Sequence, residues 1–133
     1  MRILLADDQP GVRSALRLLL EQEPGLEVVG EAADAERLLD SAGSAHPDVI
    51  LLDWELPDRQ APNGGAGGAE HLVAGIHVAF PSAKVIALSG RMEACQAALA
   101  GGADAFVSKS EPPERLLAAL EAVAPEWQST QTL

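Results

Sequence analysis

Five side chains that could act together on a phosphate group stand at the ends of apolar runs. These runs end in Asp7 and Asp8, in Asp53, in Ser89 and in Lys109. Mg²⁺ prefers carboxylate, water and phosphate oxygens as ligands. A carboxylate whose charge is masked can attack phosphorus, while an ammonium and a hydroxyl contact the negative oxygens of the transferred group. The residue types therefore predict Mg²⁺-dependent transfer of a phosphoryl group to a carboxylate.

Asp7 and Asp8 are adjacent, so their charges repel. Two carboxylates about 4 Å apart repel by about 4 kcal/mol at an effective dielectric constant of about 20. A bound divalent cation would offset this repulsion. Each residue also has a plainer interpretation, since Asp8 could cap a helix, Ser89 could lie in a turn, and Lys109 could be a surface lysine.

These residues can meet only if a sheet positions them. Apolar, β-rich runs predict strands at 3–6, 26–32, 48–53, 84–89 and 105–109. Helical spacing predicts helices over 10–23, 34–44, about 69–80, about 92–100, and from 112 or 113 to a stop before Pro125. Three of the strands are almost wholly apolar, which is typical of strands buried on both faces of a parallel sheet.

The alternation of strands and helices predicts an α/β fold with (βα)5 topology. We expect a doubly wound, five-stranded parallel sheet of the flavodoxin-like kind, in the order 2-1-3-4-5. Ligands of such sheets bind outside the carboxyl ends of the strands. The five side chains should therefore converge on one rim.

The composition limits the partners and the compartment. The 133 residues fit one domain, and the formal net charge of −11 argues against direct binding to nucleic acid or to an anionic membrane. No apolar run reaches the roughly 18 residues that span a bilayer, and no export signal opens the chain. Cys95 is the one cysteine and is interpreted as a small residue on a helix. We expect a cytoplasmic protein.

Three segments carry a resemblance to a known family, namely "ILLADDQP", "PDVILLDWELP" and "GGADAFVSKS". Over residues 1–124 the chain resembles the receiver domain of bacterial two-component response regulators. Its first 32 residues look most like the NarL/FixJ branch. We expect a receiver domain over 1–124 and a polar, frayed tail over 125–133. No DNA-binding domain follows, so we expect either a stand-alone receiver or one taken from a longer protein.

The resemblance implies a role for each residue of the rim. Asp53 would accept a phosphoryl group from a sensor histidine kinase or a phosphotransfer protein. Asp8 and Asp53 would bind Mg²⁺ directly, together with the backbone carbonyl of Glu55, and Asp7 would act through metal-bound water. Lys109 would pair with a phosphoryl oxygen.

The resemblance also implies a switch. The Ser89 hydroxyl would move toward the phosphoryl group, and the ring of Phe106 would rotate inward into the space that opens. This would change the face made by the fourth helix, the fifth strand and the fifth helix, which an output domain, an output protein or a second copy of the chain would contact. The alternative is that Phe106 is a plain core residue.

The chain departs from the family pattern in three places. Ser110 follows Lys109 where the family often has proline, so a trans bond and a strained cis bond are both open. The Gly-rich loop over 58–68 is longer than usual, and we interpret it as a flexible insertion in preference to a binding loop. The connection "SGRMEACQ" after the fourth strand is shorter than usual.

Glu55 and Arg91 stand two residues after Asp53 and Ser89, respectively. We hypothesise that they flank the phosphorylation site and form an ion pair that hinders the hydrolytic water. The pair would then tune the lifetime of the aspartyl phosphate.

Together these features predict a phosphorylation-activated signalling switch and not a turnover enzyme. The chain would catalyse only its own phosphorylation and its own slow dephosphorylation. Two alternatives stay open. One is a degenerate receiver that binds partners without phosphorylation. The other is an aspartate-nucleophile phosphohydrolase of the haloacid dehalogenase type, for which Glu55 has the right spacing but the wrong residue type.

Overall fold

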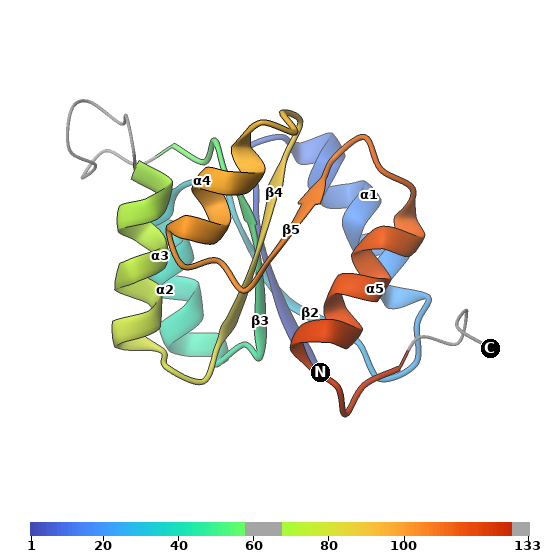
Figure 1. Cartoon of the computed structure of the whole chain (residues 1–133). Coiled ribbons are helices and arrows are strands. Elements are labelled where there is room, and N and C mark those ends of the chain that lie inside the picture. Colours follow the sequence, from blue (N-terminus) through green and yellow to red (C-terminus); the bar gives the residue numbers. More distant parts are fainter. Residues whose placement is uncertain (58–67, 129–133) are drawn as a thin grey trace.

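The sheet has the predicted strands in the predicted order. The computed structural model describes residues 1–57 and 68–128. The strands are β1 (Arg2–Ala6), β2 (Glu27–Ala32), β3 (Val49–Asp53), β4 (Lys84–Ser89) and β5 (Ala105–Ser108). They form one parallel sheet in the order β2-β1-β3-β4-β5 (Figure 1). The doubly wound, flavodoxin-like topology is thus confirmed.

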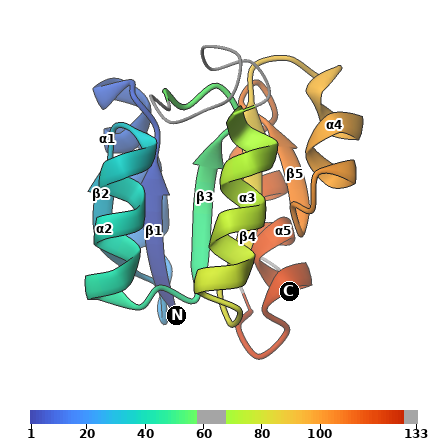
Figure 2. The same ribbon diagram turned by 90° about the vertical axis from the view of Figure 1, so that its left-hand side faces the viewer.

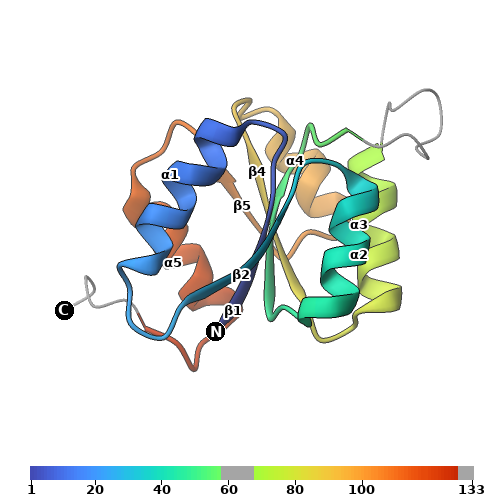
Figure 3. The same ribbon diagram turned by 180° about the vertical axis from the view of Figure 1, so that it is seen from behind.

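Helices cover both faces of this sheet. They are α1 (Pro10–Glu21), α2 (Ala35–Ala45), α3 (Gly68–Ala79), α4 (Ala94–Ala100) and α5 (Pro113–Val123). Figure 1, and Figure 3 from behind, show α1 and α5 on one face and α2, α3 and α4 on the other. No helix within residues 1–57 and 68–128 combines the length and the apolar character needed to cross a bilayer.

The central strand β3 is buried on both faces, as its apolar sequence predicts. All five of its residues are buried. Val49 and Leu51 pack in the cluster under α1 and α5, whereas Ile50 and Leu52 pack in the cluster under α2, α3 and α4. This alternation follows from the two-residue period of a strand. The carboxylate that ends β3 is therefore mounted on a rigid element.

Local signals set where the helices begin. Pro10 and Pro113 stand in the first turns of α1 and α5, where a missing N–H costs nothing. The side chain of Asp34 caps α2 by accepting the backbone N–H of Arg37 at 2.9 Å. The N-cap residue of α1 is Gln9, so the interpretation of Asp8 as a helix cap is wrong.

Trp127 corrects the expectation of a frayed tail over 125–133 for the described part of that segment, residues 125–128. Trp127 is only 7% exposed, and its indole N–H donates to the carbonyl of Pro24 at 3.0 Å. A Cβ atom at Gly25 would lie 3.2 Å from this ring, and Gly25 has a φ of +85°, which favours glycine. The large apolar ring is buried because it covers the loop between α1 and β2. Residues 129–133 lie outside the described residues.

The described residues settle one of the sequence departures and leave another outside them. The predicted loop at 58–68 lies outside the described residues, apart from Gly68, where α3 begins. The bond between Lys109 and Ser110 is trans, since no cis peptide occurs in the described part of the chain.

Candidate functional site

The predicted residues meet at the carboxyl end of the sheet. Asp7 and Asp8 follow β1, Asp53 ends β3, Ser89 ends β4, and Lys109 follows β5. This rim is the upper edge of the sheet in Figure 2, where the arrow of β3 points. The rim is the place where an open α/β sheet binds its ligands.

Backbone hydrogen bonds fix the residues that follow the strands. The N–H of Lys109 donates to the carbonyl of Ser89 at 2.8 Å, and the N–H of Trp54 donates to the carbonyl of Leu88 at 2.7 Å. These bonds continue the contacts between neighbouring strands past β5 and β3. The side chains at the rim are thus held by the sheet itself.

Three carboxylates form a cluster on this rim. Asp7, Asp8 and Asp53 each offer one oxygen, and these oxygens lie within 4.8 Å of one another. Asp7 is 1% exposed and Asp53 is 2% exposed, whereas Asp8 is exposed. An all-oxygen donor set that is open to water on one side fits Mg²⁺, which keeps several of its waters when it binds.

Backbone groups orient the two buried carboxylates. Oδ1 of Asp7 accepts the N–H of Gln9 at 2.9 Å, and Oδ1 of Asp53 accepts the N–H of Glu55 at 3.0 Å. Arg13 donates to the backbone carbonyl of Asp7 at 2.5 Å. Each carboxylate therefore keeps its direction without help from a metal.

Lys109 supplies the positive charge between the two buried carboxylates. Its Nζ atom lies 2.8 Å from Oδ2 of Asp7 and 3.3 Å from Oδ1 of Asp53. Burial alone would lower the pKa of Lys109, but the hydrogen bond to Asp7 and the charges of Asp53 and Asp7 outweigh it and raise the pKa above its ordinary value. Lys109 is thus held as an ammonium.

The surroundings of Asp53 oppose its ionisation. Burial raises the pKa of Asp53, and the charge of Asp7 adds to this effect, while the Glu55 N–H and Lys109 oppose it. The net pKa lies above the ordinary value of an aspartate. Further positive charge at the cluster would stabilise the ionised form, which is the form that can act as a nucleophile.

The Ser89 hydroxyl is bonded to the side chain of Glu55. Ser89 is fully buried, and its Oγ atom lies 3.0 and 3.1 Å from the two carboxylate oxygens of Glu55. Arg91 pairs with the same carboxylate at 3.1 Å. The hypothesised ion pair between Glu55 and Arg91 is therefore present, and its effect on hydrolysis stays a prediction.

Two aromatic residues, Trp54 and Phe106, belong to the core and not to the rim. Trp54, directly after Asp53, is 8% exposed and belongs to the core cluster under α2, α3 and α4. Phe106 is partly buried and packs against the same cluster. Both the core interpretation and the switch interpretation of Phe106 are compatible with this position.

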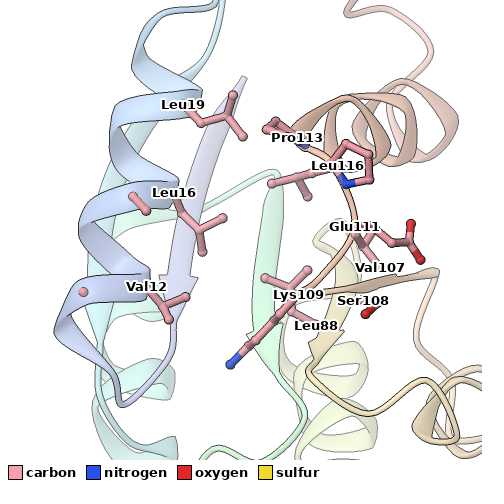
Figure 4. Close-up of a pocket in the computed structure, with 13 residues that line it drawn as sticks. Val12, Leu16, Leu19, Leu88, Val107, Ser108, Lys109, Glu111, Pro113 and Leu116 are labelled. Atoms are coloured by element: carbon pink, nitrogen blue, oxygen red, sulfur yellow. The ribbon is translucent and has the colours of Figure 1, made fainter.

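A cavity of about 380 Å³ opens beside the rim, between α1 and the start of α5 (Figure 4). Leu16 and Leu19 line it from α1, and Leu116 lines it from α5. The stem of Lys109 forms part of its wall, while the amino group points away from Leu116 (Figure 4). An apolar surface thus adjoins the charged site.

Two features of the site escape the sequence interpretation. The hydrogen bond from Ser89 to Glu55 is one, although the place of Glu55 two residues after Asp53 is a signal that could have suggested it. The other is the turn after β5, where the hydroxyls of Ser108 and Ser110 lie 2.9 Å apart. The repeated serine in "SKS" is its only signal in the sequence.

A family model and curated relatives match nearly the whole chain. The model of the response regulator receiver domain matches residues 3–121. The nitrate/nitrite response regulator protein NarL of Escherichia coli K12 is 36% identical over 129 residues, which cover 92% of this chain and 54% of that protein. The chain therefore spans about half the length of such relatives.

A solved structure and a relative that matches over only part of its own length are also similar to this chain. The isolated REC domain of RcsB from Salmonella enterica serovar Typhimurium, solved in the presence of the phosphomimetic BeF3⁻, has a TM-score of 0.81 and 27% identity, covering 97% of this chain and 91% of that one. A protein-glutamate methylesterase/protein-glutamine glutaminase of Methanosarcina acetivorans is 30% identical over 111 residues, but these make up only 30% of that protein.

Proposed function

From the membership of this chain in the response regulator receiver domain family, we infer that it is a signalling switch in which Asp53 accepts a phosphoryl group. The observation that carries this proposal is the convergence of the rim. Buried Asp53 lies beside Asp7 and Asp8, with the Lys109 ammonium 3.3 Å from its carboxylate. A nucleophile, a cation-binding set and a fixed positive charge are thus assembled in one place.

Transfer exchanges one bond to phosphorus for another. A phosphohistidine of a sensor kinase or a phosphotransfer protein presents the phosphoryl group, an oxygen of Asp53 bonds to phosphorus, and the nitrogen–phosphorus bond breaks to release the imidazole. The hydrogen bond that the Glu55 N–H donates to Oδ1 of Asp53 would keep the carboxylate oriented during this step. Lys109 can turn from Asp7 and Asp53 toward a phosphoryl oxygen, because all these groups share one small site.

The acidic cluster is the proposed Mg²⁺ site. Asp8 and Asp53 would hold the ion with the backbone carbonyl of Glu55, and Asp7 would contact it through water. When bound, Mg²⁺ supplies positive charge that masks the carboxylates and the phosphoryl oxygens. The exposure of Asp8 and the ion pair between Asp7 and Lys109 support this division of roles.

The output would pass through Ser89 and Phe106 to the face formed by α4, β5 and α5. Ser89 ends β4, and Phe106 lies in the adjacent strand β5, paired with Ala87. Ser89 therefore lies in a strand that pairs directly with the strand of Phe106. A shift of Ser89 toward the phosphoryl group would change the surroundings of the Phe106 ring. Glu55 and Arg91 would set how fast water reaches the aspartyl phosphate.

The partners follow from the same role. A kinase or phosphotransfer protein would donate the phosphoryl group, and an output domain or protein, or a second copy of the chain, would contact the output face. The acidic charge of −11 supports contact with proteins in preference to nucleic acid. A cytoplasmic location fits a donor of this kind. The chain would act as a switch and catalyse only its own phosphorylation and its slow reversal.

Binding of beryllofluoride with Mg²⁺ tests the proposal. This phosphoryl mimic should change the fluorescence of buried Trp54 in the parent protein, because Trp54 directly follows Asp53. The variant Asp53→Asn should show no such change. An equal change in both proteins, or none in the parent, would count against Asp53 as the acceptor.

A further inference from the structure

The Ser89 hydroxyl already donates a hydrogen bond to the Glu55 carboxylate in this structure. Its Oγ atom lies 3.0 and 3.1 Å from the Glu55 carboxylate oxygens and accepts the backbone N–H of Arg91 at 3.0 Å. A hydroxyl carries one proton and can donate it to one acceptor at a time. While it donates to Glu55, Ser89 cannot donate to a phosphoryl oxygen.

The Glu55 side chain is held in this place from a second direction. Arg91 Nη2 lies 3.1 Å from Oε2 of Glu55, and the backbone N–H of Glu55 donates to Oδ1 of Asp53 at 3.0 Å. One residue thus contacts the proposed acceptor with its backbone and the proposed switch hydroxyl with its side chain. Changes at Asp53 and at Ser89 are therefore linked through Glu55.

We propose that Glu55 is a positioning residue that holds the Ser89 hydroxyl in the unphosphorylated state and competes with the phosphoryl group for it. This rests on the proposed function of Asp53. Phosphorylation then includes an exchange in which the Ser89 O–H leaves the Glu55 carboxylate and donates to a phosphoryl oxygen. Arg91 keeps the released carboxylate paired, so the exchange leaves no unpaired charge.

The competition is between two anionic acceptors of similar strength. Hydrogen bonds to charged groups are among the stronger ones in proteins, and a carboxylate and a phosphoryl group both form them. The Glu55 side chain is 42% exposed, which weakens its hold through competition with water. Removing the Glu55 carboxylate should therefore raise the rate of phosphorylation by about three- to tenfold. This is less than the loss of a fully buried charged hydrogen bond would give.

A double-mutant cycle over Glu55→Ala and Ser89→Ala separates this competition from plain charge repulsion. The readout is the rate at which acetyl phosphate with Mg²⁺ phosphorylates each protein, followed by intact mass. With Ser89 present, Glu55→Ala should raise the rate by about three- to tenfold. In the Ser89→Ala background, the same change at Glu55 should have no further effect.

An equal acceleration in both backgrounds would overturn the proposal, because it would mean that the charge of Glu55 merely repels the anionic donor. No acceleration with Ser89 present would overturn it as well. Glu55→Gln provides the matched variant, since its amide oxygen can still accept the Ser89 hydroxyl while its charge is gone. A rate for Glu55→Gln that is clearly lower than that of Glu55→Ala supports the proposal, because the amide oxygen still holds the hydroxyl, and a rate equal to that of Glu55→Ala contradicts it.

The experiment also distinguishes the two proposals from each other. If the parent gains no phosphoryl group, or gains one that Asp53→Asn also gains, the proposed function itself fails. If the parent is phosphorylated on Asp53 and the cycle shows no coupling, only the role of Glu55 fails.

Discussion

The Nζ atom of Lys109 lies 2.8 Å from Oδ2 of Asp7, so that the loop after β5 is tied to the end of β1. Asp7 is almost completely buried, and the Lys109 side chain is 22% exposed. Without bound metal, this ammonium is the nearest positive charge to the buried carboxylates among the ion pairs of the described residues. Lys109 and Mg²⁺ should therefore partly replace each other in neutralising the site.

Replacing Lys109 by Met should destabilise the metal-free protein by about 3 kcal/mol, because two buried carboxylates lose their paired charge. Saturating Mg²⁺ should raise the free energy of unfolding of this variant by more than it raises that of the parent. Urea denaturation in EDTA and in Mg²⁺ measures both effects. Lys84→Met is the matched control, since Lys84 is exposed at the start of β4. Equal stability of Lys109→Met and Lys84→Met in EDTA would contradict the assignment.

The second prediction concerns the exposed member of the acidic cluster. Asp8→Asn should weaken Mg²⁺ binding by about tenfold, because a neutral amide replaces a directly bound carboxylate. Titration of Mg²⁺ against Trp54 fluorescence gives the dissociation constant. The control Asp40→Asn removes an exposed carboxylate from α2 and should leave the constant unchanged. Identical titration curves for the parent and Asp8→Asn would remove Asp8 from the ligand set.

A pH-dependent contribution to stability is expected at Glu31. Arg13 and Arg17 donate to its two carboxylate oxygens at 3.0 and 2.8 Å. Burial opposes ionisation, but the two arginines outweigh it and lower the pKa of Glu31. A depressed pKa means that this stabilisation is present above the unfolded value of about 4.3 and is lost as the pH falls through the folded value.

Glu31→Gln should therefore be less stable than the parent by about 0.5–1 kcal/mol at neutral pH, the range for partly exposed pairs. The difference should shrink below about pH 4.3. Urea denaturation at several pH values measures it. Glu27→Gln is the control, because Glu27 is 68% exposed and lies 3.7 Å from Arg2. A difference between parent and Glu31→Gln that does not shrink in acid would contradict the charged pairing.

The last stability prediction concerns the C-terminal segment. Trp127→Phe should cost about 1 kcal/mol, because it removes the indole donor to Pro24 and keeps an aromatic ring. Trp127→Ala should cost about 3 kcal/mol, because it also empties the space over Gly25. Leu18→Ala, at a side chain that is 64% exposed, should cost less than about 0.5 kcal/mol. If Trp127→Ala cost no more than Leu18→Ala, the segment would not be packed in solution.

Most of the sheet can be predicted from the sequence, because its buried strands are continuous apolar runs. The apolar runs that became β1, β3 and β4 are buried on both faces, and their ends carry the polar residues of the rim. Parallel topology places Asp7, Asp53 and Lys109 at one edge of the sheet, since all its strands end there. The long side chain of Lys109 then reaches past β4, which lies between β3 and β5, to both carboxylates. Residue types and periodicity were sufficient for this part.

Other features depend on contacts that no local pattern records. The bond between Ser89 and Glu55 depends on side-chain directions in two loops that follow different strands. The burial of Trp127 depends on Pro24 and Gly25, which are distant in the sequence, and its polar neighbours suggested a frayed tail instead. Such tertiary contacts override local composition.

The most direct test of the central claim is the mass of the intact protein after incubation with acetyl phosphate and Mg²⁺. The account predicts that the parent gains the mass of one phosphoryl group and that Asp53→Asn gains none. Asp40→Asn, which alters an exposed carboxylate on α2, should gain one group like the parent. No gain on the parent, or an undiminished gain on Asp53→Asn, would contradict the account, and the former would favour a receiver that binds its partners without phosphorylation.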